Sequence, residues 1–237
     1  MRAIHRRGGF TLVELLIVIG LIALLLSLLL PTVSAARKQA QRLQCASNLR
    51  SIGQVMFAYS ADNKGLAPRD YLYEEQYLAG HIFWAEAFGS YFSKSFPSPH
   101  PDISIARDDI LGPACAKIPA YQCPANPNPD QPVDYVSNAW SVTDPANPFS
   151  GSSGLVNITR IRHSSQIVFL TEANQWLDAQ RFFMYDVSKP AHLPPSNGSR
   201  ILDDERHRGA INMLFFDGHV HAAPWNGITE RDFRGPD

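Results

Sequence analysis

A continuous apolar stretch near the N-terminus constrains the fold of this chain more than any other feature. Residues 10–30 read FTLVELLIVIGLIALLLSLLL, and only four residues interrupt the apolar side chains: Thr11, Glu14, Gly20 and Ser27. A helix of this length is roughly 30 Å long, which matches the hydrocarbon thickness of a bilayer. The sequence therefore predicts a helix that spans a membrane once.

The flanks of this stretch leave its orientation and its processing open. Three basic residues precede it within Met1–Gly9 and three follow it within Arg37–Arg42, so basic residues alone do not set the orientation. A conventional cleaved secretory signal is one alternative, with Val33-Ser34-Ala35 as its small-residue cleavage site. Against it, such signals have apolar regions of only about 7–15 residues.

Glu14 also argues against a disposable signal. It is the one ionisable residue inside the apolar stretch. A carboxylate within a membrane helix costs on the order of 2–3 kcal/mol even on insertion-based scales. We therefore expect Glu14 to have a function or a partner that offsets this cost.

The residues around Glu14 resemble a known processing motif. The string Gly9-Phe10-Thr11-Leu12-Val13-Glu14 is similar, position by position, to the cleavage region of type IV prepilins and of the pseudopilins of type II secretion. The resemblance implies that an aspartyl prepilin peptidase cuts after Gly9, the end of a leader peptide spanning residues 1–9, and methylates the new amino terminus at Phe10. It also implies roles in processing and assembly for Thr11, Leu12 and Glu14.

Filament assembly would give Glu14 a partner. In the prepilin family the apolar helices, here residues 10–30, form the core of a filament. Cleavage creates a positively charged amine at Phe10, and methylation keeps its charge. The carboxylate of Glu14 in one subunit can then pair with the amine of a neighbour, which makes both buried charges tolerable.

The pattern changes after Pro31 to a one-sided helix. Apolar residues recur at steps of three and four, which is typical of an amphipathic helix facing a core: Ala36, Ala40, Leu43, Ala46, Leu49, Ile52, Met56 and Tyr59. Asp62–Gly65 is the predicted stop, with Gly65 in the left-handed conformation. We expect residues 31–65 to continue the membrane helix and residues 66–237 to form a globular head.

The head has the pattern of an α+β fold. Nine of the 18 prolines fall within residues 97–132, which predicts a surface loop without long helices or central strands. Short strands are expected at Asp134–Trp140, Gln166–Leu170, Arg181–Val187, Ala210–Phe216 and His219–Ala223. The last two form a hairpin, about residues 210–223, around Asp217-Gly218. The predicted fold is pilin-like: a long N-terminal α-helix, membrane-spanning in its first half, packed on an antiparallel sheet.

A second resemblance covers most of the head. Arg206-His207, nine residues, and then Asp217-Gly218 resemble the motif of the prepilin-type proteins named for His-x9-Asp-Gly, a domain of unknown function. Other fragments agree in order: Cys45–Leu49, Ile52-Gly53, Tyr121–Pro124, Tyr135–Asn138 and Glu172. The insert around residues 70–115 departs from the common pattern. No role follows from the resemblance for His207, Asp217 or Gly218.

The histidines near the C-terminus suggest a metal site, but a structural explanation is stronger. His219 and His221 would share a strand face, and together with His207 and Asp217 they would suit zinc. Asp217-Gly218 is already explained as a turn, however, and His207 is expected to bond the backbone of that hairpin. We predict no metal and no cofactor.

Three cysteines leave two disulfide pairings open. An oxidising compartment favours one bridge and one buried thiol. Cys115 and Cys123 are the locally convenient pair, whereas Cys45 with Cys123 would tie the helix to the proline-rich loop. The sequence does not decide between these pairings.

Charge and motifs narrow the function. A formal charge of −1 gives no basic field for nucleic-acid binding, and no catalytic motif is present, so we predict that the protein is not an enzyme. The resemblance implies a pilus or pseudopilus subunit in the bacterial inner membrane, with its N-terminus cytoplasmic and its head periplasmic. Its expected partners are prepilin peptidase, other pilin or pseudopilin subunits and membrane lipid. The alternatives are a membrane-tethered ligand-binding domain and, less favoured, a periplasmic enzyme.

Overall fold

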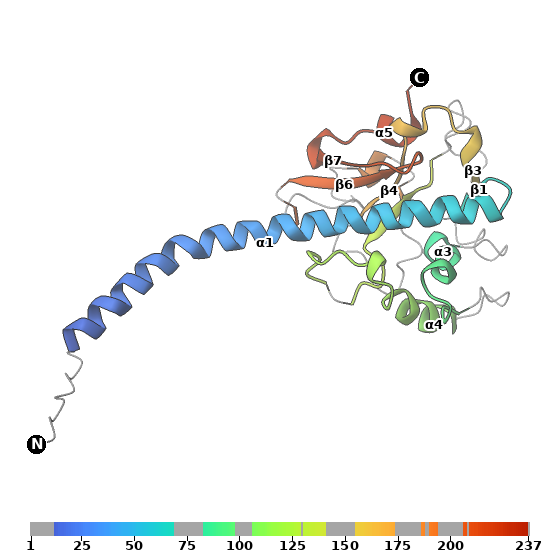
Figure 1. The fold of residues 1–237 in the computed structure, drawn as a ribbon. Coiled ribbons are helices and arrows are strands. Elements are labelled where there is room, and N and C mark those ends of the chain that lie inside the picture. Colours follow the sequence, from blue (N-terminus) through green and yellow to red (C-terminus); the bar gives the residue numbers. More distant parts are fainter. Residues whose placement is uncertain are drawn as a thin grey trace, which may run out of the picture. The chain divides into compact units, whose positions relative to one another are not determined.

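The computed structural model describes residues 12–68, 83–97, 106–128, 130–140, 155–173, 186–187, 190–193, 206–207 and 209–236. The chain divides into two compact units, Met1–Ala40 and Gln41–Asp237. One helix, α1 (Leu12–Asp62), begins in the first unit and ends in the second (Figure 1).

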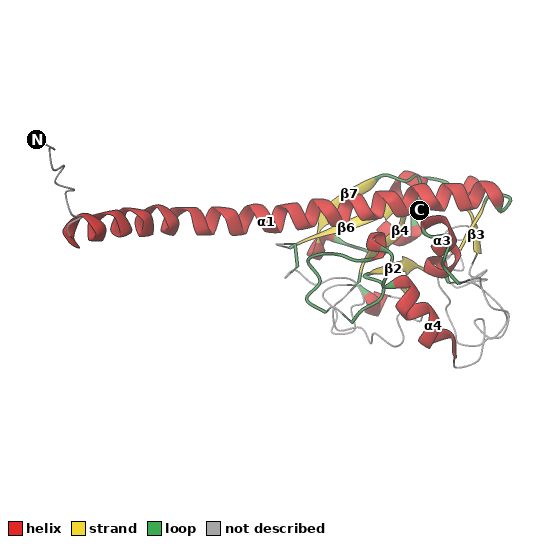
Figure 2. Cartoon of the chain, turned by 60° about the horizontal axis from the view of Figure 1, so that its bottom comes forward, coloured by secondary structure: helices red, strands yellow, loops and turns green. Residues whose placement is uncertain are grey.

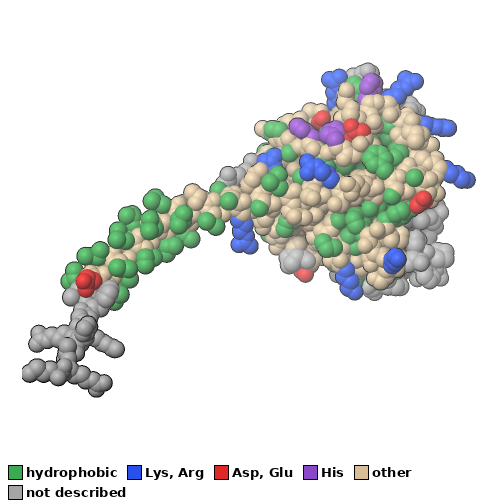
Figure 3. Space-filling view, in the orientation of Figure 1, with side chains coloured by type: hydrophobic (Ala, Val, Ile, Leu, Met, Phe, Trp, Pro, Cys, Tyr) green, Lys and Arg blue, Asp and Glu red, His purple; other side chains and the backbone are tan. Residues whose placement is uncertain are grey.

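The first unit contains the N-terminal part of α1, whose side chains from Leu12 to Ser34 are exposed. Every residue from Leu12 to Leu30 is exposed, and Figure 3 shows apolar side chains along the visible face of this part of the helix. The hydroxyls of Ser27 and Thr32 donate to carbonyls of their own helix, so these polar groups are satisfied internally. Among the described residues, α1 is the one helix long and apolar enough to cross a membrane.

In the second unit, one face of α1 is buried against the head. The buried residues recur at helical spacing: Cys45, Ala46, Asn48, Leu49, Ile52, Gly53, Met56 and Ser60. The predicted stripe was wrong in its first three positions, because Ala36, Ala40 and Leu43 are exposed. At about 100° per residue, these three positions lie on the opposite side of the helix from the buried stripe.

The helix ends at the predicted position. The backbone amide of Gly65 donates to the carbonyl of Ser60 at 2.9 Å, and Gly65 has a φ of 82°. This left-handed conformation favours glycine because it has no Cβ. The chain then turns into a short strand, β1 (Leu66–Pro68), which pairs antiparallel with β3 (Leu155–Asn157).

The main sheet has five strands in the order β5-β2-β4-β6-β7, and Figure 2 labels β2, β4, β6 and β7. Their bounds are Tyr135–Asn138 (β2), Val168–Glu172 (β4), Asp186–Val187 (β5), Ala210–Phe215 (β6) and Val220–Pro224 (β7). The pairs β2–β4, β4–β6 and β6–β7 are antiparallel, whereas β5 runs parallel to β2. The sheet is therefore antiparallel except at this edge.

The five predicted strands correspond in order to those of the main sheet, with shifted bounds, whereas β1 and β3 were not predicted. Ser164–Gln166 form a 3-10 turn, so the strand predicted from Gln166 begins at Val168 and extends to Glu172. Only Asp186-Val187 of the strand predicted over 181–187 belong to the described residues.

The core has two parts, one on each face of the main sheet. Leu49, Ile52 and Met56 of α1 pack in one cluster with Phe169 and Leu214 of the sheet. The other cluster contains alternate residues of β6 together with side chains from β2 and the C-terminal region: Ile211, Met213, Phe215, Val136, Trp140 and Phe233. Alternation along β6 therefore places Leu214 toward α1 and its two neighbours toward the opposite face.

Two helices in the middle of the chain were not predicted. The helix α3 (Trp84–Phe92) contributes Trp84 and Phe88 to the core cluster that contains α1. The second, α4 (Ala106–Cys115), lies within the proline-rich segment predicted as a loop. Pro113 has no amide to bond the carbonyl four residues before it, and the helix ends two residues later at Cys115. No element longer than the 3-10 turn Pro119–Tyr121 follows in the described part of that segment. A last short helix, α5, spans Arg231–Arg234.

Candidate functional site

A disulfide joins α1 to the proline-rich segment. Cys45 on the buried face of α1 is bonded to Cys123, with a Cα–Cα distance of 5.1 Å. The alternative pairing, Cys115 with Cys123, is wrong for this structure. Cys115 at the end of α4 is free and fully buried in the core cluster beside α1, and burial raises the pKa of its thiol to about 12. The disulfide therefore fixes the loop to the helix rather than closing a local loop.

Asn48, one turn after Cys45, satisfies the backbone of the same segment. Its Nδ2 donates to the carbonyl of Gln122 at 2.6 Å and to that of Pro119 at 3.2 Å. The side chain of Gln44 donates in turn to Oδ1 of Asn48 at 3.0 Å. Backbone carbonyls that are shielded from water need another hydrogen-bond donor. The side chain of Asn48 supplies that donor for the carbonyls of Pro119 and Gln122.

Asp134 holds the loop from its other side. The backbone amide of Cys123 donates to Oδ2 of Asp134, and Nδ2 of Asn126 donates to Oδ1. Burial raises the pKa of Asp134 to about 6, although both hydrogen bonds act to lower it. The carboxyl group of Asp134 is therefore desolvated, and its two hydrogen bonds to Cys123 and Asn126 hold the loop in place.

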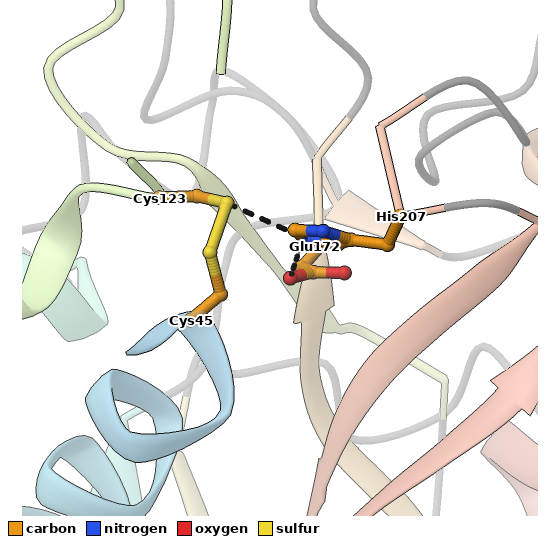
Figure 4. A group of neighbouring side chains, drawn as sticks. All are labelled: Cys45, Cys123, Glu172 and His207. Atoms are coloured by element: carbon orange, nitrogen blue, oxygen red, sulfur yellow. Dashed lines mark hydrogen bonds and ion pairs between the residues drawn. A yellow bond between two sulfur atoms is a disulfide. The ribbon is translucent and has the colours of Figure 1, made fainter. Parts of the chain in front are cut away.

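His207 and Glu172 meet beside the disulfide (Figure 4). The distance from His207 Nε2 to Glu172 Oε1 is 2.9 Å, and the distance from His207 Nε2 to Cys123 Sγ is 3.4 Å. Both side chains have no exposed surface. The prediction that His207 bonds the backbone of the hairpin is therefore wrong: its ring faces Glu172 at the end of β4.

Glu172 also completes the pairing between β4 and β6. The register of these two strands ends with the pair Thr171 and Met213. The next residue of β6, Asn212, donates its backbone amide to Glu172 Oε2 at 3.0 Å and its Nδ2 to Oε1 at 2.9 Å. The carboxylate therefore accepts where a strand carbonyl would otherwise do so, and three donors converge on it.

Asp217-Gly218 forms the β6–β7 turn, as predicted, and this turn contacts α1. Gly218 has a φ of 87°, and a Cβ placed there would lie 2.6 Å from the ring of Phe57. Gly53 faces the same turn: a Cβ there would lie 2.9 Å from Leu214 and 3.6 Å from the Gly218 backbone. Asp217 accepts from the backbone amide of His219 at 3.1 Å and contacts the ring Nδ1 at 2.6 Å. The two glycines therefore allow helix and hairpin to approach closely.

The residues considered and rejected as a metal site, His207, Asp217, His219 and His221, do not come together as one group of potential ligands in the described residues. His219 pairs with Asp217 on the surface, whereas His207 is buried with Glu172. Within the described ranges, the potential metal ligands that lie together are Cys45, Cys123, Glu172 and His207, whose ligand atoms lie within 4.8 Å of one another. Sequence reasoning singled out each of these residues but did not bring them together. It missed the roles of Asn212 and Asp134, which no motif marks.

The residues of the processing motif lie at and before the start of α1. Leu12 is the first residue of the helix and is 80% exposed, and Glu14 lies in its first turn. Gly9, Phe10 and Thr11 lie outside the described residues.

Comparisons with known proteins agree on the N-terminal region. Residues 4–30 match the family described as the prokaryotic N-terminal methylation motif. The type IV wide pilus major component PilA4 of Thermus thermophilus is 44% identical over 55 residues, which cover 23% of this chain and 42% of that protein. The chain thus spans less than half of this relative. No solved structure matches the chain.

These findings define a class. The methylation motif over residues 4–30, the similarity to a pilin over 55 residues and the long apolar helix packed on a sheet in its second half are the features of a type IV prepilin-like protein. The resemblance of the head to the His-x9-Asp-Gly domain remains a prediction.

Proposed function

We propose that this chain is a structural subunit of a type IV pilus-like filament or a type II secretion pseudopilus. Prepilin peptidase would cut after Gly9 and methylate Phe10, and the mature subunit would leave the inner membrane by joining the filament through α1. The head would remain on the periplasmic side, where a disulfide is stable.

The observation that carries the proposal is the exposed apolar surface of α1 next to the processing motif. All residues from Leu12 to Leu30 are exposed, and residues 4–30 match the methylation motif. Such a surface requires lipid or other apolar helices to cover it. In a filament, the apolar helices of neighbouring subunits would cover this surface once the subunit leaves the bilayer.

The head supports the proposal by the way it is fastened to α1. The Cys45–Cys123 disulfide, the bonds of Asn48 and the contact of Gly218 with Phe57 all act on the second half of the helix. Several side chains of the second resemblance serve this junction, namely Cys45, Cys123 and Asn48. A subunit that is pulled into a filament by its helix needs such a connection.

Glu14 provides the test of assembly. We expect Glu14→Ala to be processed like the wild type but to be missing from sheared filaments, because the amine of a neighbouring subunit loses its partner. Ser27→Ala is the matched control, since it removes a polar group from the same apolar stretch whose hydroxyl bonds only Leu24 of its own helix. The readout is the amount of subunit in the filament fraction relative to the membrane fraction. Normal incorporation of Glu14→Ala would contradict the proposed pairing.

A further inference from the structure

The four side chains at the disulfide have the composition of a zinc site. Two sulfurs, an imidazole nitrogen and a carboxylate oxygen converge from four separate segments: Cys45 from α1, Cys123 from the loop, Glu172 from β4, and His207 before β6 (Figure 4). All four residues are buried. Thiolate, imidazole and carboxylate ligands are those that zinc takes in closed tetrahedral sites.

The distances also fit tetrahedral coordination. Zinc–ligand bonds of about 2.0–2.3 Å place a sulfur and a nitrogen ligand about 3.5 Å apart, and a nitrogen and an oxygen ligand about 3.4 Å apart. The corresponding distances are 3.4 Å between Cys123 Sγ and His207 Nε2, and 2.9 Å between His207 Nε2 and Glu172 Oε1. The two sulfurs, which are bonded to each other, would need to separate, and the ligand atoms, which lie within 4.8 Å of one another, would adjust to a common centre.

The imidazole is able to offer the required nitrogen. Nε2 faces the cluster, and Nδ1 has no hydrogen-bond partner among the described residues. In the structure Glu172 favours the proton on Nε2, so a metal bound at Nε2 would take the place of this proton, and the neutral ring would carry its proton on Nδ1. Asn212 donates to both oxygens of Glu172 and would orient this ligand.

We propose that, when the Cys45–Cys123 bond is reduced, this chain binds Zn²⁺ through Cys45, Cys123, His207 and Glu172. A dithiol reductant would transfer two electrons and two protons to the bridge, leaving two thiols and a cyclic disulfide of the reductant. Zn²⁺ would then displace the two thiol protons to solvent and bind both thiolates. The disulfide and the metal would be alternative cross-links between the loop and α1. The metal would also connect both to the end of β4, through Glu172, and to the segment before β6, through His207.

The test uses the full chain in detergent. Oxidised and phosphine-reduced samples would be loaded with Zn²⁺ without oxygen, freed of unbound metal and analysed for zinc. We expect about one zinc ion per reduced chain and none in the oxidised chain. Circular dichroism would be recorded on the same samples, and the reduced, zinc-loaded chain should keep its folded spectrum. Loss of that spectrum, or a reduced chain that retains no zinc, would overturn the proposal.

Cobalt and variants test the ligand set. In the reduced chain, Co²⁺ should give a thiolate charge-transfer band and the intense visible bands of tetrahedral coordination, and Zn²⁺ should remove both. Cys45→Ser should lower the intensity of the cobalt charge-transfer band, because one of the two thiolates is lost. His207→Ala should weaken zinc binding by about tenfold or more. Cys115→Ser and His219→Ala are the controls and should bind as the wild type does. Unchanged binding in His207→Ala, or an unchanged cobalt spectrum in Cys45→Ser, would assign the metal elsewhere.

Discussion

His207 Nε2 lies 2.9 Å from Glu172 Oε1 in a place that solvent does not reach. The two residues are 35 positions apart in the sequence, and β6 begins three residues after His207. The pair therefore joins the end of β4 to the segment that enters β6. Since Asn212 donates to the same carboxylate, this contact fixes the pairing of two central strands.

Replacement of Glu172 by glutamine should destabilise the head strongly. Glutamine has one acceptor oxygen and adds an NH2 group where Asn212 and His207 direct their donors, so buried donors lose their partners. We expect the free energy of unfolding to fall by about 2–4 kcal/mol, measured by urea denaturation in detergent. Glu230→Gln is the control, because that side chain is 42% exposed and its pair with Arg234 spans 3.5 Å. It should change stability by less than about 0.5 kcal/mol. Equal effects of the two variants would contradict the role of Glu172.

Replacement of Gly218 by alanine should weaken the junction between hairpin and helix. The positive φ and the 2.6 Å approach to the ring of Phe57 both penalise a side chain there. We expect a loss of about 1–3 kcal/mol in the free energy of unfolding. Gly227→Ala is the matched control, since nothing lies within 4 Å of a Cβ at that position. Adding Phe57→Ala to Gly218→Ala should recover part of the loss, and strictly additive effects would argue against this contact.

The sequence predicted features that depend on neighbouring residues. The stop of α1 at Gly65 and the Asp217-Gly218 turn follow from local backbone requirements, and both are present. The burial of α1 was predicted well from Ala46 onward but not before it. Spacing alone does not show which side of a helix the head will cover, and Leu43 is 58% exposed on the other side.

Features that depend on distant residues were not predictable. The choice of Cys45 over Cys115 as the partner of Cys123 depends on where the loop crosses α1. The buried acceptor of His207 likewise follows from the register of β4 and β6, which the sequence does not encode locally. The helix α3 was missed because its apolar residues, Trp84 and Phe88 among them, are equally compatible with a strand.

The cysteines should differ sharply in reactivity. In the oxidised native chain we expect no cysteine to react with iodoacetamide, because Cys45 and Cys123 are bonded and burial raises the pKa of Cys115 to about 12. In urea without reductant, Cys115 alone should be alkylated, as located by peptide mass spectrometry. Alkylation of Cys45 under these conditions would contradict the pairing. The same peptides after reduction serve as the positive control.

Removal of the disulfide should be costly because it closes a long loop. The bridged cysteines are 78 residues apart, for which loop-closure entropy predicts a loss of about 4 kcal/mol. The double variant Cys45→Ala, Cys123→Ala should therefore unfold at much lower urea concentration than Cys115→Ala, which leaves the bridge intact. Similar midpoints for the two variants would show that the bridge contributes little.

Asp134 should make the head less stable as the pH rises from about 4 to 6. Burial raises its pKa from 3.8 to about 6, so in this window the folded chain binds more protons at this group than the unfolded chain does. Its contribution to the free energy of unfolding therefore falls with rising pH, by on the order of 3 kcal/mol in total, and is constant above the window. Asp134→Asn should remove this component. The wild-type and variant stabilities would be compared by urea denaturation at each pH, and parallel curves would contradict the prediction.

The amino terminus of the mature protein tests the central claim most directly. Expressed in a host with prepilin peptidase and purified from membranes, the chain should yield an N-terminal peptide that begins with N-methylated Phe10, as determined by tandem mass spectrometry. The same chain from a host without the peptidase should retain its leader. A mature protein that begins at Ala36, as after a conventional signal, or that retains Met1 in the peptidase-containing host, would contradict the assignment as a prepilin.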